Sequence, residues 1–242
     1  MKRVSLLILT IIVTTAFGVG AEAIAKITRI EGKASVLKKG GVDWRDAKPL
    51  MLLEAGDQLY TREESFAEIR YAIGTVLRMD EKTKITLETS SEKTLKTRSA
   101  VGDVWINMKK LLSRGNEFDV STPTAVAAIR GTVFRMKSNP DSSSEVDVYN
   151  GRVAVGPSDE LRERLHPGKP LRPMEKPVEV PGPEEIPGPF EVPLDQWRDI
   201  VAGQKIEIRP DGKFKQEKFN MAAAEKFVKI NEELDKELMK EK

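Results

Sequence analysis

The side chains that most often carry out catalysis are scarce in this sequence. It has no cysteine and a single histidine, His166, among 242 residues. A chain without cysteine has no disulfide, thiol nucleophile, cysteine-ligated zinc or lipidated cysteine anchor. His166 precedes Pro167-Gly168 at the edge of a proline-rich segment, where a solvated histidine is expected. Its isolation argues against histidine-based triads and most histidine-rich metal sites.

Carboxylates are the other candidates for chemistry, and the chain has 38 of them. Most alternate with lysine and arginine, which is typical of a solvated face. A glycosidase needs two placed carboxylates, and no such pair stands out. The glycines form no phosphate-binding pattern before a helix. The sequence therefore indicates no catalytic residue, no cofactor and no metal site, and it predicts a protein that is not an enzyme.

Four large side chains remain as candidates for contacts. We expect Arg130 to bridge carbonyls of the turn at residues 121–123 and fix two strands against each other, since a planar guanidinium can bond several acceptors. A contact with a ligand carboxylate or a partner, and simple exposure to solvent, are the alternatives. The tryptophans could line a glycan or peptide groove or else pack in the core; they are Trp44, Trp105 and Trp197.

Charge and the N-terminus indicate where the protein acts. The net charge of +2 is close to balance, and no basic stripe is interleaved with aromatics, so nucleic-acid binding is not expected. Lys2-Arg3 precede an apolar run at 4–19 that is shorter than the roughly 20 residues of a spanning helix. Small residues then offer cleavage after Ala23 or Ala25. We predict a signal peptide at 1–23 and an exported, periplasmic or extracytoplasmic protein, with an uncleaved membrane anchor as the alternative.

Short extended runs opened by glycine follow from residue 27 onward. Two of them are near copies, GTVLRM at 74–79 and GTVFRM at 131–136. Short strands separated by turn signals indicate an all-β sandwich or irregular β-roll of mostly antiparallel strands. The glycine spacing is too uneven for a regular solenoid. We place this β-domain at 26–156 and its closing strands at 197–214.

Two further segments complete the chain. Residues 157–196 are rich in proline and are expected to form a long insertion or linker, with helical turns only at 159–165. Residues 219–242 are predicted to form a charged amphipathic helix capped by Asn220. Its apolar stripe should pack on its own domain, a partner helix or a membrane surface; it consists of Phe227, Ile230, Leu234 and Leu238.

Several of these motifs resemble the FecR domain. They are LLEAGDQLYT at 52–61, FAEIRY at 66–71, VGDVW at 101–105, FDVSTP at 118–123 continuing into AIRGTVF at 128–134, VYNGRVAV at 148–155, AGQK at 202–205 and Asp211-Gly212. The resemblance spans about 27–156 and resumes at 197–214. Its most specific part is the combination of Thr122-Pro123 with Arg130, Gly131 and Thr132.

The resemblance implies an exported all-β module of the kind found in regulators of ferric-citrate-type uptake. Those regulators bind a sigma factor through a cytoplasmic segment. We expect no such segment before the predicted signal peptide, so no direct sigma-factor contact is expected. The family offers no catalytic residue to carry over. We therefore expect a protein-interaction, sensing or scaffolding module of the cell envelope with an envelope protein as partner, and a glycan-binding module for cell-wall or surface polysaccharide as the alternative.

Overall fold

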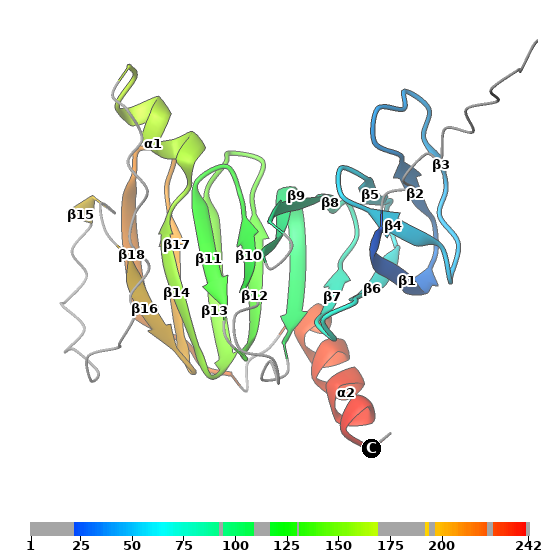
Figure 1. Cartoon of the computed structure of the whole chain (residues 1–242). Helices are drawn as coiled ribbons and strands as arrows, with labels where there is room; N and C mark the ends of the chain where they lie inside the picture. The colour runs from blue at the N-terminus through cyan, green and yellow to red at the C-terminus, as the bar shows by residue number, and fades with distance from the viewer. Residues whose placement is uncertain are drawn as a thin grey trace, which may run out of the picture.

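The protein is a β-sandwich that carries one helix on an outer face (Figure 1). The computed structural model describes residues 22–91, 94–108, 117–129, 131–168, 192–193, 197–221 and 225–240. Every strand pairing among these residues is antiparallel, except that β9 and β10 run parallel. The predicted all-β fold with a C-terminal helix is confirmed.

The strands form two sheets, which we call sheet A and sheet B. Neighbours in sheet A run in the order β4 (Leu52–Glu54), β1 (Ala23–Glu31), β6 (Phe66–Tyr71), β7 (Val76–Met79), β9 (Thr94–Asn107), β12 (Val133–Ser138), β13 (Ser144–Asn150), β17 (Gln204–Ile208), β18 (Lys213–Lys218) and β15 (Val192–Pro193). Sheet B runs β3 (Arg45–Asp46), β2 (Ala34–Leu37), β5 (Gln58–Thr61), β8 (Lys84–Ser91), β9, β10 (Glu117–Ser121), β11 (Ala125–Ile129), β14 (Arg152–Pro157) and β16 (Arg198–Val201).

The hydrophobic core lies between the two sheets. Alternating residues of each strand face inward, such as Leu77 of β7 and Ile106 of β9 in sheet A and Val120 of β10 in sheet B, and they belong to one buried cluster. Tyr71 of sheet A packs edge-on against Phe118 of sheet B, with ring centroids 4.9 Å apart. Its hydroxyl also bonds that of Thr97. The residues on the opposite side of sheet A are therefore left to build an outer face.

Strand β9 joins the sheets, because its first half pairs in sheet B and its second half in sheet A. The change occurs at Gly102, which adopts φ +102. A Cβ at this position would lie 2.3 Å from Oγ1 and 2.4 Å from Cα of Thr83. The same Oγ1 accepts a 2.9 Å hydrogen bond from the Asp103 amide. Glycine is required here because both the dihedral angle and the close approach exclude a side chain.

We predict that Gly102→Ala lowers the free energy of unfolding by about 2–5 kcal/mol, from backbone strain and overpacking together. Gly203→Ala is the matched control, since Gly203 also has positive φ but meets no heavy atom within 4 Å. That control should lose only about 1 kcal/mol. Urea unfolding of both variants measures the difference, and equal losses would show that the contact with Thr83 is unimportant.

The strands that follow the proline-rich segment join the same sandwich. β16 pairs with β14 in sheet B, while β17 pairs with β13 in sheet A. The short helix α1 spans Asp159–Leu165, the range expected from the sequence, and Ser158 caps it by accepting a 3.0 Å hydrogen bond from the Leu161 amide. The greater part of the proline-rich segment lies outside the described residues.

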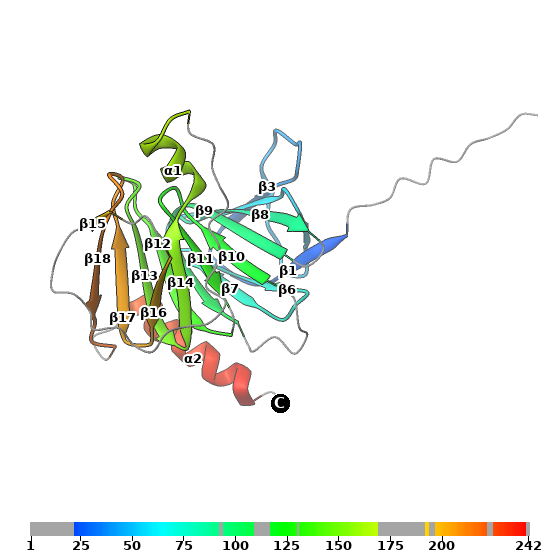
Figure 2. The same cartoon turned by 60° about the vertical axis from the view of Figure 1, so that its left-hand side comes forward.

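The C-terminal helix α2 spans Lys226–Lys240. It lies against the outer face of sheet A, below the sandwich in Figure 1 and Figure 2. Asn220 is six residues before its first residue, so the predicted cap at Asn220 is wrong. No helix in the described part of the chain is long and apolar enough to span a membrane.

Candidate functional site

The two near-identical hexapeptides lie on either side of the same strand. β7 and β12 both run antiparallel to β9, and Arg78 and Arg135 stand directly opposite Trp105 from its two sides. Residues opposite one another in a ladder project to the same face. The fifth residue of each copy therefore places a guanidinium beside the Trp105 indole on the outer face of sheet A.

These residues belong to a row of alternating charge across the sheet. The paired positions, in order from β6 to β18, are Glu68, Arg78, Trp105, Arg135, Asp147, Lys205 and Glu217. Opposite charges at directly facing positions attract, whereas like charges would repel. The row is thus self-complementary, and helix α2 covers its centre.

Arg78 is completely buried and connects the sheet to α2. Its Nε donates to Oε2 of Glu68 at 2.7 Å, and its Nη1 donates to Oδ1 of Asp235 on the helix at 2.5 Å. The other Asp235 oxygen accepts from Nε1 of Trp105 at 3.0 Å. A buried charge is tolerated only when it is paired and hydrogen-bonded. Asp235 therefore ties α2 to β7 and β9 at once.

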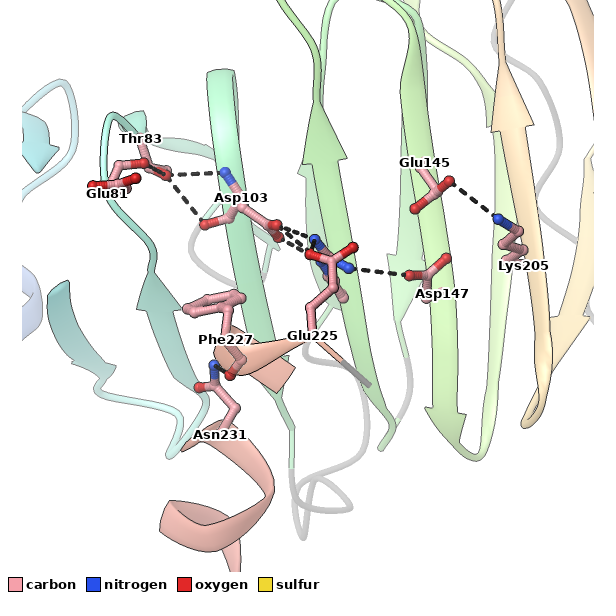
Figure 3. A network of polar contacts seen from close by, with 10 residues as sticks. Glu81, Thr83, Asp103, Glu145, Asp147, Lys205, Glu225, Phe227 and Asn231 are labelled. Atoms are coloured by element: carbon pink, nitrogen blue, oxygen red, sulfur yellow. Dashed lines mark hydrogen bonds and ion pairs between the residues drawn. The ribbon is translucent and has the colours of Figure 1, made fainter. Parts of the chain in front are cut away.

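Arg135 makes an equivalent contact with Glu225, just before the first residue of the helix. Its Nε lies 2.9 Å from both carboxylate oxygens of Asp103, and its Nη2 donates to Oε2 of Glu225 at 2.8 Å (Figure 3). The hydrogen bond from Arg135 holds the pKa of Glu225 below its usual range. Because Glu225 directly precedes α2, the two repeat arginines hold one acidic residue just before the helix and one, Asp235, within its C-terminal half. We call Arg78, Trp105 and Arg135 the arginine clamp.

A cavity of about 240 Å³ lies beside Arg135, between the outer face of sheet A and the chain entering α2. Asp147 of β13 lines it and is only 5% exposed. Its Oδ2 is 3.7 Å from Nη1 of Arg135, and its Oδ1 has no hydrogen-bond partner among the described residues. Burial, followed by the neighbouring charge of Glu145, raises the pKa of Asp147 to about 7.

The sequence pattern did not reveal these buried charges. Alternation of carboxylates with lysine and arginine predicted a solvated face, and this is wrong for Glu68, Asp103 and Asp147, which α2 and the chain before it help to bury. The sequence feature that could have revealed them is the repeated hexapeptide. It places an arginine at the same position of two strands, and both arginines lie in similar buried environments beside Trp105.

The Thr122-Pro123 motif forms a tight turn between β10 and β11. The Thr122 amide donates to the Ala125 carbonyl at 2.8 Å, while Oγ1 of Thr122 accepts from the Ala125 amide at 3.0 Å. This hydroxyl also lies 2.7 Å from that of Ser144. Ser158 donates to the Pro123 carbonyl at 2.6 Å. The turn is therefore bonded to both β13 and the start of α1.

The second half of the motif precedes β12. Gly131 adopts φ +73, and Thr132 is buried with no hydrogen-bond partner for its hydroxyl among the described residues. A Cβ at Gly151 would lie 2.8 Å from Cγ2 of Thr132, which shows how closely the two turns approach. Arg130 lies outside the described residues, so its expected bridge to the Thr122-Pro123 turn stays a prediction.

The structure does not bring the three tryptophans together into one groove. Trp105 is 1% exposed beneath α2, so it is unavailable to a glycan or partner, and its inclusion among contact residues is corrected. Trp197 is half-buried against Gly156. Trp44 is 39% exposed, with Tyr60 edge-on at 6.3 Å and the Lys84 ammonium 5.5 Å from its ring centroid.

Helix α2 presents a face to the sheet that differs from the predicted stripe. Phe227 is buried and Leu234 packs against the cluster around Trp105, but Ile230 is exposed and Leu238 only partly covered. The remaining buried residues of α2 are Val228, Asn231 and Asp235. The predicted apolar stripe did not include Asn231 and Asp235. A hydrophobic pattern cannot show that these polar residues face the buried Arg78.

The described residues contain no group of three or more histidine, cysteine or carboxylate side chains placed to hold a metal ion. Within this part of the chain, the outer face of sheet A instead uses its carboxylates to bind arginine. Its chemistry is that of an ion-pair network that fixes a helix, with a polar cavity at one end.

Comparison with known proteins identifies a protein family that part of the chain matches. The family model described as "FecR protein" matches residues 57–154. No curated protein matches the sequence. Two crystal structures of "a putative anti-sigma factor from Parabacteroides distasonis ATCC 8503", at 1.65 and 2.50 Å resolution, are similar in structure.

These two structures share 14% and 13% sequence identity with this chain, with TM-scores of 0.47 and 0.48. The similar region covers 67% of this chain and 60% of each of those chains. The matched family region begins just before β5 and ends within β14, so it includes both hexapeptides, the Thr122-Pro123 turn and the arginine clamp. The chain therefore carries a FecR domain at residues 57–154, and the family resemblance inferred from its motifs is confirmed over that range.

Proposed function

We propose that this protein is an exported, non-enzymatic FecR-domain protein that acts as a protein-interaction module for sensing or scaffolding in the cell envelope. The FecR match at 57–154 is the observation that carries the proposal. The carboxylates on the outer face support it, since Glu68, Asp103 and Asp235 are engaged by arginine. Carboxylates held in this way stabilise a surface and are poorly placed for acid-base chemistry.

The edge of sheet B is the surface that we assign to the partner. β16, at Arg198–Val201, pairs with β14 on one side, and it is longer than the other described edge strands, which are β3, β4 and β15. An edge strand can bind an extended segment of another protein through backbone hydrogen bonds. Helix α2 is already bound to sheet A, so it is not needed as the contact.

The proposed export makes a prediction about the mature N-terminus. β1 begins at Ala23, and Ala25 is buried and paired with Leu53 and Tyr71. Cleavage after Ala25 would remove this buried residue, whereas cleavage after Ala23 keeps it. We expect Ile24 to be the first residue of the exported protein, as measured by intact mass. An N-terminus at Lys26 would contradict this assignment, and an intact leader would favour the membrane anchor.

Photo-crosslinking in living cells tests the proposed function. A photoreactive residue is placed at Ala202, which is exposed directly after β16, and as a matched control at Ala72, which is exposed in the β6–β7 turn. We expect one dominant envelope protein to be captured from Ala202 and not from Ala72. Reciprocal crosslinking from that protein should return to β16.

Two outcomes would contradict the proposal. Capture of no protein from either position would remove the interaction function. A smear of wall or surface polysaccharide without a protein would favour the glycan-binding alternative, which in this structure depends mainly on the exposed Trp44. Co-sedimentation with isolated wall material, and its loss in Trp44→Ala, would then establish that alternative.

A further inference from the structure

The cavity beside Arg135 contains a carboxylate that the protein leaves without a donor. Asp147 lines this cavity and is only 5% exposed, and its buried Oδ1 has no hydrogen-bond partner among the described residues. Buried polar atoms are nearly always hydrogen-bonded, and an orphaned carboxylate oxygen is costly. The Asp147 carboxylate at this cavity is therefore a hydrogen-bond acceptor that a ligand with an N–H or O–H donor can satisfy.

The two cations next to Asp147 are already committed to other carboxylates. Arg135 binds Asp103 and Glu225 at 2.5–2.9 Å but lies 3.7 Å from Asp147. The ammonium of Lys205 lies 3.4 Å from Glu145 and 3.2 Å from Glu217. Neither cation is therefore within hydrogen-bonding distance of Asp147.

The lining of the cavity has an excess of negative charge. Its charged members are two cations, Arg135 and Lys205, and three carboxylates, Glu145, Asp147 and Glu225, so two minus three leaves a net charge of −1 when Asp147 is ionised. Tyr149 and Phe219 also line it, with ring centroids 5.2 Å apart. Aromatic rings attract ammonium groups through their electron-rich faces.

The composition and size of the cavity narrow the class of ligand. The described residues offer no cluster suited to a metal ion, so an organic cation fits better. A volume of about 240 Å³ equals that of roughly eight water molecules at about 30 Å³ each. An alkylammonium group of four or so carbons fits within this space, where it can donate N–H to a carboxylate and pack its stem on aromatic rings.

We propose that this cavity is a binding site for a primary alkylammonium group, whose N–H donates to the carboxylate of Asp147. The group has two sources, a free small amine or the lysine side chain of another protein. The site lies on sheet A at the N-terminal end of α2, away from the β16 edge assigned to the partner, and it does not depend on that assignment.

An NMR titration that follows the amides of β13 tests the proposal. The probes are n-butylammonium chloride, the neutral analogue 1-butanol, and sodium chloride at matched ionic strength. A tripeptide with a central lysine, blocked at both termini, and the same peptide acetylated on that lysine, represent the protein source. We expect saturable binding of n-butylammonium, the free-lysine peptide or both, and no binding of the neutral analogues.

The same titration separates the site from general charge attraction. Asp147→Asn should weaken binding at least tenfold, whereas Asp43→Asn, which removes the same charge from an exposed loop, should leave it unchanged. Equal binding by both variants, equal binding of 1-butanol, or no binding of either ammonium probe would overturn the proposal. Binding of only one ammonium probe supports it and identifies the source.

A pH series on the unmodified protein gives a test that needs no variant. The groups that face Asp147 are Arg135, Lys205, Glu145, Glu225 and Tyr149, with Asp103 beyond Arg135. Burial, followed by the charge of Glu145, raises the pKa of Asp147 to about 7. An alkylammonium ion stays protonated from pH 6 to pH 8, while Asp147 ionises across this range. Affinity should therefore rise about tenfold from pH 6 to pH 8, and a flat profile would contradict the contact with Asp147.

Discussion

Replacing Arg78 with methionine is expected to lower the free energy of unfolding by about 3–5 kcal/mol. Methionine keeps much of the side-chain volume but leaves the carboxylates of Glu68 and Asp235 buried without their cation. The cost of an unpaired buried charge exceeds the value of the lost contact itself. Urea denaturation of the purified mature protein measures this loss.

Two companion variants make the result specific to the arginine clamp. Arg70→Met makes the same change at an exposed position of β6 and should shift stability by no more than about 0.5 kcal/mol. Adding Asp235→Leu to Arg78→Met should cost much less than the sum of the two single variants, because the second change removes the stranded carboxylate. Additive losses, or a loss below about 1 kcal/mol for Arg78→Met, would show that the ion pair does not hold α2.

Replacing Asp147 with asparagine is expected to stabilise the protein above neutral pH. The folded state raises the pKa of Asp147 from 3.8 to about 7, because burial disfavours the ionised carboxylate and Glu145 repels it. The folded state therefore holds its proton more tightly than the unfolded state. The stabilisation of the folded state by the protonated Asp147 is fully present below about pH 4, and it is lost as the pH rises to about 7. At about 1.4 kcal/mol per pKa unit, the loss reaches at most roughly 4 kcal/mol.

The difference between the two proteins isolates this residue from the other titrating groups. Asp147→Asn and the unmodified protein should be similarly stable near pH 4, and the variant should be more stable by about 2–4 kcal/mol at pH 8. Urea midpoints measured across this pH range provide the test, with Asp43→Asn as the exposed control. A variant that is less stable at pH 8 would mean that the 3.7 Å contact with Arg135 outweighs the cost of burial.

Much of the fold was predictable because it depends on local patterns. Glycines and β-branched runs marked the strands, and the helical turns expected at 159–165 coincide with α1. The FecR motifs predicted the family region that contains both copies of the hexapeptide. Each of these signals is carried by a few neighbouring residues in the sequence.

The candidate site was less predictable because it depends on pairing across the sheet. Arg78 and Arg135 are 57 positions apart, and only the ladder places both of them beside Trp105. The sequence drew attention to Arg130 instead, because it adjoins a conspicuous glycine. The burial of Asn231 and Asp235 on α2 was not predictable from the sequence. Polar residues on a charged helix are expected to be solvated unless their partners are known.

Hydrogen exchange of the purified protein shows whether the arginine clamp holds α2 on sheet A. A helix of 15 residues is only marginally stable alone in water, so its amides report whether it is docked. We predict that α2 is protected in the unmodified protein. In Arg78→Met, α2 should exchange rapidly while β10 and β11 stay protected. If α2 exchanges like a free peptide in the unmodified protein while the sandwich stays protected, the arginine clamp does not hold the helix, and the helix is available to a partner.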